Sequence, residues 1–260
     1  MRDEPGHGTM QRFMIWIAIA VCIACAPSRA ADPAGELVRL AVDPWAPFGG
    51  ETLPGGGLSP DIISTVLERA GYRVESHIVP WARALDGVKT GDYDLLGSLF
   101  FDAELETFLS FSVPYHETDI RFIKRVDSPF AFSSIQALEG LTIAVGDGYL
   151  YEEAFDNASE LDKHVVTTVL QGLRMVAGGR VDLTLDSVDV LDHLLHVEDP
   201  SLAARLEYVP GTLARRGVRF AIRDDFPGKD RLLEAFEREL LALQADGALE
   251  TLRTRHASVR

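Results

Sequence analysis

Short apolar runs of strand type alternate with segments of helical period along most of this chain, and this alternation constrains the fold more than any other feature. The strand-type runs lie at 37–42, 74–79, 93–99, 141–145, 165–169, 182–185, 206–209 and 218–222, and the helical segments at 59–70, 81–89, 171–177, 187–197 and 230–246. Such alternation predicts largely parallel sheets with helices on both faces. We therefore expect an α/β protein.

The helix start at Ser59 is the clearest boundary signal. Ser59 is expected as N-cap, Pro60 in the first turn and Asp61 near the positive end of the helix dipole. Further along, two similar strand–helix blocks divide the chain near residue 124, and a last strand–helix piece follows them. Two lobes that face each other would bring the carboxyl ends of their strands to one cleft, where such sheets bind small ligands.

The N-terminal region has the features of an export signal. Residues 13–26 (FMIWIAIAVCIACA) are apolar, Arg12 precedes them, and Ser28 and Ala30 fit the small positions before a cleavage site. The run is shorter than the roughly 20 residues that cross a bilayer. We expect residues 1–30 to be a cleaved signal peptide and the mature protein to be periplasmic. An uncleaved anchor and a lipid anchor on Cys25 are the alternatives.

Composition excludes several classes of function. The formal net charge of −15 disfavours nucleic acid and anionic membranes as partners. Both cysteines lie inside the expected signal peptide, which leaves the mature chain without thiolate ligands or disulfides. The histidines lack metal-ligand spacing, and no phosphate loop, dinucleotide fingerprint or nucleophile elbow is present. We expect no metal, no cofactor and no catalytic residue.

Several motifs together resemble one known family. They are VDPWAPF at 42–48, GLSPDI at 57–62, GDYDLL at 91–96, FSVPY at 111–115, LEGLTIAV at 138–145 and GRVD at 179–182. In order and spacing, they resemble the family-three extracellular solute-binding proteins, which are the periplasmic receptors of polar amino acid ABC importers. The resemblance extends over nearly the whole mature chain.

The resemblance implies a two-lobed periplasmic-binding-protein fold (type II), with mixed sheets, flanking helices and two crossing strands as the hinge. We expect these strands near 121–125 and 219–223, lobe 1 at 31–123 and 222–260, and lobe 2 at 124–221. It also implies capture of a small-molecule ligand by hinge closure, an inner-membrane ABC permease as partner, and a monomer.

The family pattern changes at the ligand-binding positions. In amino-acid receptors of this family, an arginine after the strand that contains Asp94 binds the ligand carboxylate, and the matching position here is Leu105. An isobutyl group cannot replace a guanidinium that binds a carboxylate through two hydrogen bonds. The family's acid for the ligand ammonium falls at Ser187 or at Asp186 beside it. A standard α-amino acid is therefore doubtful as the ligand.

The remaining candidates for ligand contacts are aromatic and polar side chains at the ends of the predicted strands. Any single aromatic could instead belong to the core, and Asp43 could instead cap a turn. Arg83 is a candidate partner for a ligand anion in place of the missing arginine. It could instead be a solvated surface residue. The glycine turn at 146–148 is expected to open a helix whose amides could hold an anion. The full candidate set is Asp43, Trp45, Phe48, Trp81, Arg83, Ser98, Phe100, Phe101, Gly148, Tyr149 and Asp186.

Two other classes of function remain open. An enzyme on the same fold, similar to the cyclohexadienyl dehydratases, would use an acid such as Asp43, Asp102 or Asp186. A sensory module would present its ligand to a separate membrane receptor.

Overall fold

The computed structural model describes residues 35–257, which belong to one compact unit. The expected signal peptide and Cys25 lie outside the described residues. The strands are β1 (Leu37–Val42), β2 (Arg73–Ile78), β3 (Leu95–Leu99), β4 (Leu109–Phe111), β5 (His116–Arg125), β6 (Thr142–Gly146), β7 (Asp162–Val166), β8 (Leu183–Ser187), β9 (Leu206–Tyr208) and β10 (Ala214–Arg223). The helices are α1 (Leu58–Arg69), α2 (Trp81–Thr90), α3 (Glu153–Asp156), α4 (Val169–Ala177), α5 (Val188–His193), α6 (Lys229–Ala245) and α7 (Ala248–His256).

The strands form two sheets that share β10, and this confirms the expected two-lobed α/β fold. In the first sheet β1 lies parallel to β2 and β3, and β10 pairs antiparallel with β3 and β4. In the second sheet β6 lies parallel to β7 and β8, while β5 pairs antiparallel with β8, β9 and β10. The sheets are therefore mixed, with parallel strands joined by helical connections.

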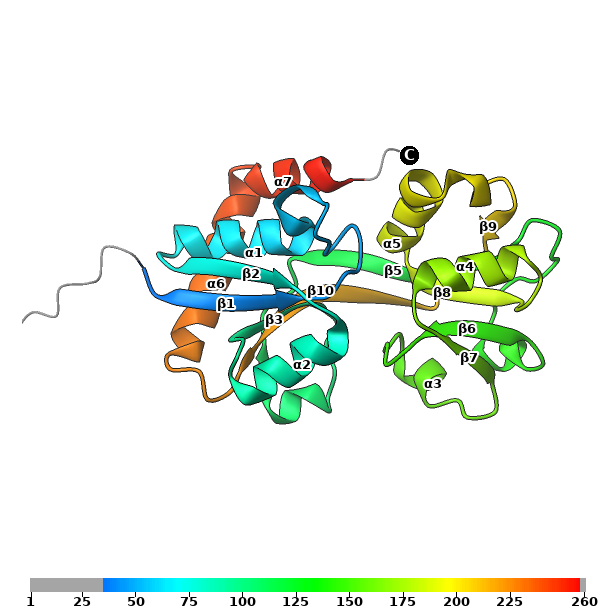
Figure 1. Ribbon diagram of the computed structural model, residues 1–260, viewed down its shortest axis with the longest axis horizontal. Helices are drawn as coiled ribbons and strands as arrows, with labels where there is room; N and C mark the ends of the chain where they lie inside the picture. Colours follow the sequence, from blue (N-terminus) through cyan, green and yellow to red (C-terminus); the bar gives the residue numbers. More distant parts are fainter. Residues whose placement is uncertain (1–34, 258–260) are drawn as a thin grey trace, which may run out of the picture. The chain divides into compact units, whose positions relative to one another are not determined.

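Strands β5 and β10 are the connections between the lobes (Figure 1). Strand β10 pairs with β5 through Val218 and with the first sheet from Arg219 onward. Residues 121–125, which were expected at the first crossing, pair with β8 and β9 and therefore lie inside the second sheet. The expected lobe boundaries stay a prediction.

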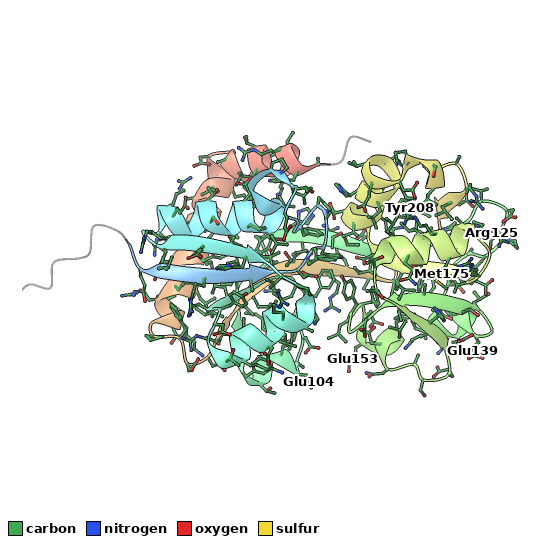
Figure 2. The ribbon with its side chains drawn as sticks, in the orientation of Figure 1. Glu104, Arg125, Glu139, Glu153, Met175 and Tyr208 are labelled. Atoms are coloured by element: carbon green, nitrogen blue, oxygen red, sulfur yellow. The ribbon has the colours of Figure 1, made fainter. Side chains whose placement is uncertain are left out.

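Helices cover both faces of each sheet, as the alternation predicts. In the first lobe α1 and α2 lie on opposite faces of the strands, and α4 and α3 do so in the second (Figure 1). Buried residues of α1 (Ile62, Ile63, Val66 and Leu67) repeat at helical spacing and form the centre of the core. Charged side chains such as Glu104, Glu139 and Glu153 lie at the periphery (Figure 2).

Two expected helix starts are wrong. Helix α1 begins at Leu58 with Gly57 as its N-cap, so Ser59 lies inside the helix, where its hydroxyl accepts a hydrogen bond from Tyr115 (2.8 Å). A Cβ at Gly57 would lie 2.5 Å from the carbonyl oxygen of Phe48, and its φ of 113° also favours glycine. The second is the turn at 146–148, which does not open a helix: the next helix is the short α3. No helix dipole therefore strengthens an anion site on the amides of this turn.

Candidate functional site

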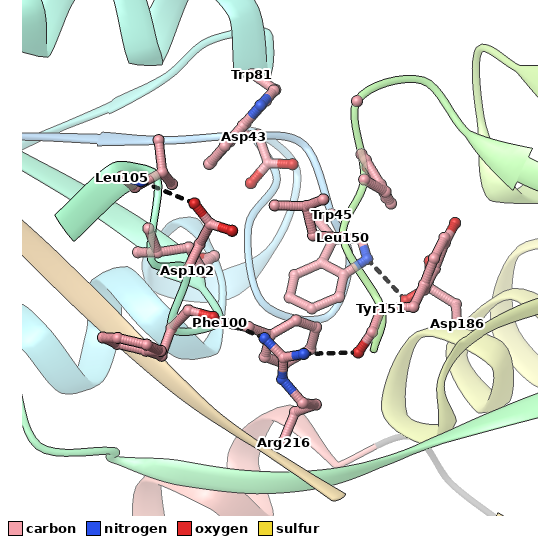
Figure 3. Close-up of a pocket in the computed structure, with 15 residues that line it drawn as sticks. Asp43, Trp45, Trp81, Phe100, Asp102, Leu105, Leu150, Tyr151, Asp186 and Arg216 are labelled. Carbon is pink, nitrogen blue, oxygen red and sulfur yellow. Dashed lines mark hydrogen bonds between the residues drawn. The ribbon is translucent and has the colours of Figure 1, made fainter. Parts of the chain in front are cut away.

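A pocket between the two lobes receives side chains from the ends of several strands (Figure 3). It contains about 560 Å³ of space, part of which is open to solvent. We call it the interlobe pocket. Its lining residues are Asp43, Trp45, Trp81, Ser98, Leu99, Phe100, Phe101, Asp102, Leu105, Gly148, Tyr149, Leu150, Tyr151, Asp186 and Arg216.

Asp43 is the buried carboxylate of the first lobe. It directly follows β1, its residue is only 6% exposed, and Oδ1 has no hydrogen-bond partner among the described residues. Burial disfavours the charged form and raises the pKa of Asp43 to about 7. Oδ1 is therefore available to a ligand.

Asp186 is the matching carboxylate of the second lobe. It lies on β8 and is 1% exposed; its Oδ1 accepts hydrogen bonds from the Trp45 indole (3.1 Å) and the Ser187 amide (2.6 Å). Oδ2 has no partner among the described residues. Burial, with a smaller contribution from the charge of Asp43, raises the pKa of Asp186 to about 7. Of the two sequence alternatives, it is Asp186 that lines the pocket, while Ser187 caps α5.

Ser98 is a further buried polar residue of the pocket. Its side chain lies beside the phenol of Tyr115, and its φ of 59° places it in the left-handed region. The pairing of β3 with β10 shifts register between Arg219 and Ala221, opposite this point. A bulge of this kind redirects side chains and often lies next to a functional site.

Aromatic rings form much of the wall. Trp45 stacks on Phe48 with ring centroids 4.6 Å apart and meets the edge of Phe100 at 5.6 Å. Phe101 is 43% exposed. On the opposite lobe, the ring centroids of Tyr149 and Tyr151 lie 6.3 Å apart. Burial raises the pKa of both tyrosines, so their hydroxyls stay neutral. The wall therefore offers neutral faces for stacking or for contact with a cation.

Arg216 is the basic residue of the pocket, and no sequence motif indicated it. Its guanidinium donates to the carbonyl oxygens of Tyr151 (2.8 Å) and Phe101 (2.7 Å), and lies 5.0 Å from the Phe100 ring centroid. These contacts join the two lobes. Burial lowers the pKa of Arg216, although nearby acids oppose this effect. Only the crossing of β10 between the lobes brings Arg216 here.

The structure gathers most of the predicted site residues in this pocket and leaves two outside it. Phe48 is fully buried beneath Trp45 and belongs to the core. Arg83 is exposed on α2 and does not line the pocket, as expected for a solvated surface arginine. The predicted residues that line it are Asp43, Trp45, Trp81, Ser98, Phe100, Phe101, Gly148, Tyr149 and Asp186.

Leu105 and Asp102, which the sequence singled out for other reasons, also reach the pocket. The amide of Leu105 donates to Asp102 Oδ1 (2.8 Å), and the isobutyl group forms part of the wall. An apolar side chain therefore lines the pocket at the position where the family's arginine was expected. The other lining residues that the sequence did not indicate are Leu99, Leu150, Tyr151 and Arg216.

A second cavity, of about 700 Å³ with partly open space, lies beside α7 and α5. Several of its polar side chains have partners within the protein. Asp189 accepts from Thr118 (2.6 Å) and lies 3.2 Å from His116, while His256 lies 2.8 Å from Asp61. This pairing favours a structural role.

The described residues contain no cluster of three or more histidines, cysteines or acids that could hold a metal ion. No helix within residues 35–257 is both long and apolar enough to cross a membrane.

Comparisons with solved structures support the fold. A histidine kinase sensor domain with similarity to periplasmic binding proteins is 20% identical, with a TM-score of 0.72 over 85% of this chain and 96% of that one. An arginine third transport system periplasmic binding protein from Legionella pneumophila is 19% identical, with a TM-score of 0.68 over 85% and 100%. The substrate-binding protein of an amino acid ABC transporter is 18% identical, with a TM-score of 0.68 over 85% and 98%.

A search by sequence among curated proteins finds no match. The family model of the bacterial extracellular solute-binding proteins, family 3, matches residues 38–258. This match spans both lobes and both connecting strands, as the sequence resemblance predicted. The chain therefore belongs to the family-3 bacterial extracellular solute-binding proteins.

Proposed function

We propose that this chain is a periplasmic receptor that captures one small solute in the interlobe pocket and delivers it to an ABC importer in the inner membrane. One observation carries the proposal: unpartnered, buried carboxylate oxygens reach the pocket from both lobes, Asp43 Oδ1 from the first and Asp186 Oδ2 from the second. A buried polar atom without a hydrogen bond is costly. A ligand that satisfies both oxygens stabilises the closed arrangement of the lobes.

The ligand is bound and released unchanged. Carboxyl groups with a pKa near 7 are also suited to acid–base chemistry, so this point needs a direct test. Incubation of the protein with each bound compound, followed by mass spectrometry, should recover that compound intact. Appearance of a product at a rate that depends on protein concentration would contradict a purely binding function.

A small-molecule screen by thermal shift tests the binding function itself. A ligand at a hundredfold excess over its Kd stabilises the folded state by about 2.7 kcal/mol, so a hit raises the Tm in a concentration-dependent way. Replacement of Trp45 by Ala should remove the response, since Trp45 lines the pocket and donates to Asp186. If no compound from a broad set of amino acids, amines, carboxylates and sugars raises the Tm, the receptor function is wrong.

A sensory function is the second candidate, because one similar structure is a histidine kinase sensor domain. The two functions differ in their consequence for the cell. Deletion of the gene should abolish uptake of the labelled ligand if the chain serves an importer. If uptake persists and only the transcriptional response to the ligand is lost, the sensory function is correct.

A further inference from the structure

Two buried carboxylate oxygens of the interlobe pocket, Asp43 Oδ1 and Asp186 Oδ2, have no hydrogen-bond partner among the described residues. Each can only accept hydrogen bonds when its carboxylate is ionised. Their residues are 6% and 1% exposed, respectively. A ligand that satisfies both carboxylates therefore brings at least two N–H or O–H donors to one place.

The charges that line the pocket also favour a ligand with hydrogen-bond donors and positive charge. Asp43, Asp102 and Asp186 line it together with a single basic residue among the described lining side chains, Arg216. The guanidinium of Arg216 already donates to two backbone carbonyls and lies against Phe100. The excess of negative charge therefore favours a ligand with positive charge.

The pocket also lacks a partner for a ligand carboxylate. Leu105 presents an isobutyl group to it, and Arg83 lies outside it on an exposed face of α2. A carboxylate transferred from water into this site would meet Asp43 and Asp186 without a free cation, which costs both desolvation and repulsion. The aromatic wall, in contrast, attracts a cation through the ring faces.

We propose that the ligand is a small organic cation without a free carboxylate, a protonated amine or guanidine whose N–H groups donate to Asp43 and Asp186. This inference rests on the receptor function proposed above and names the chemical class of its ligand. The body of the cation packs against Trp45, Trp81 and Tyr149.

Matched pairs of compounds test the class directly. Isothermal titration calorimetry on the full chain would compare agmatine with arginine, cadaverine with lysine, tyramine with tyrosine, and tryptamine with tryptophan. Each pair differs by one carboxylate. We expect at least one amine to bind about tenfold or more tightly than its parent amino acid, because an unpaired buried charge costs at least about 1.4 kcal/mol, or one factor of ten.

Variants connect the binding to the named oxygens. Asp186→Asn and Asp43→Asn keep the side-chain size and remove the charge, and each should weaken the amine about tenfold or more. Leu105→Arg adds a second cation to the pocket wall and should also weaken it. Asp147→Asn is the matched control, since Asp147 is exposed next to the pocket without lining it, and should leave the affinity unchanged. Circular dichroism would show that each variant is folded.

The outcomes separate this inference from the function on which it rests. If an amino acid or another carboxylate binds as tightly as any amine, the ligand class is wrong and the receptor function stands. Full amine affinity in folded Asp43→Asn and Asp186→Asn also overturns the class. If no compound of either set or of the broader screen binds, the receptor function is wrong and the inference fails with it.

Discussion

Two regions of the first lobe contain a buried aspartate, and the two aspartates differ in what surrounds them. Asp94, 3% exposed just before β3, accepts from the Arg39 amide (2.9 Å), Nε (3.0 Å) and Nη2 (3.0 Å), with Arg223 Nε at 3.5 Å. Asp43, 6% exposed after β1, has no charged partner and one free oxygen. Asp94 and Asp43 therefore lie near opposite ends of the same pair of parallel strands.

The difference appears in their pKa values. Burial alone would raise the pKa of Asp94, but hydrogen bonds and charge from Arg39, with a smaller contribution from Arg223, hold it below its usual value. Burial without such partners raises the pKa of Asp43 to about 7. A carboxylate that is buried with its cation fixes the structure of the lobe, whereas one buried without a cation is available to a ligand.

The largest expected effect is on the paired carboxylate. Asp94→Asn should lower the free energy of unfolding by about 2–4 kcal/mol, a range reduced for solvent screening because the Arg39 side chain is 37% exposed. Denaturant titration measures it. The control is Asp127→Asn, whose carboxylate pairs with Arg125 at the surface, where solvent screens the pair, and which should cost much less than Asp94→Asn. Equal losses in both variants would show that Asp94 is no structural anchor.

Replacement of the unpaired carboxylate, Asp43, should increase the free energy of unfolding rather than decrease it. The pKa of Asp43 in the folded protein, about 7, lies well above the ordinary value of an aspartate, so its contribution to stability is present below about pH 4 and is lost as the pH rises through 7. Asp43→Asn should therefore raise the free energy of unfolding by about 1–2 kcal/mol at pH 8 and change it little at pH 4. Other charged or titratable groups line the same pocket and face the Asp43 carboxylate as it titrates. They are Asp102, Tyr149, Tyr151, Asp186 and Arg216.

Denaturant titrations of Asp43→Asn and the unchanged protein at several pH values without ligand would give this difference. Asp186→Asn should follow the same pH dependence with a smaller gain, because Asp186 Oδ1 already accepts two hydrogen bonds. A loss of stability at pH 8 in Asp43→Asn would show that its carboxylate has a partner that offsets burial.

A smaller effect is expected for the hydrogen bond that partly satisfies Asp186. Trp45→Phe removes the indole donor and should lower the free energy of unfolding by about 1 kcal/mol at pH 8. It should also raise the pKa of Asp186 further, since a hydrogen bond to the charged form is lost. Nuclear magnetic resonance titration of the carboxyl carbon would measure this. An unchanged pKa would mean that the indole does not stabilise the carboxylate.

The smallest effect is expected for Arg83→Ala. Arg83 is exposed on α2 and does not line the pocket, so ligand affinity should change less than twofold, or about 0.4 kcal/mol. Calorimetry with any ligand that the screen identifies would measure this. A tenfold loss of affinity would show that Arg83 binds a ligand anion. The ligand site would then not be defined by unpaired acids alone.

The family, the fold class and much of the pocket were predictable from sequence because they depend on local patterns. Trp45 and Phe101 follow strands whose apolar runs are easily recognised, and residues just past such strands line clefts in α/β proteins. Phe48, which was also predicted to contact the ligand, lies in the core instead. It follows the same strand as Trp45, yet it turns beneath the indole into the core, and residue type alone does not separate the two positions.

The alternation of strand and helix periods by itself determined an α/β chain, since each period buries one face of an element at a fixed spacing. The two lobes followed from the division into two strand–helix blocks and from the family resemblance. The substitution at Leu105 by itself removed the expected carboxylate clamp. Only the tertiary structure decided which acids are free: it pairs Asp94 with Arg39 and leaves Asp43 and Asp186 unpaired. It also brings Arg216 between Phe101 and Tyr151. These contacts join residues far apart in the chain, and their energies depend on burial and distance, which sequence spacing does not encode.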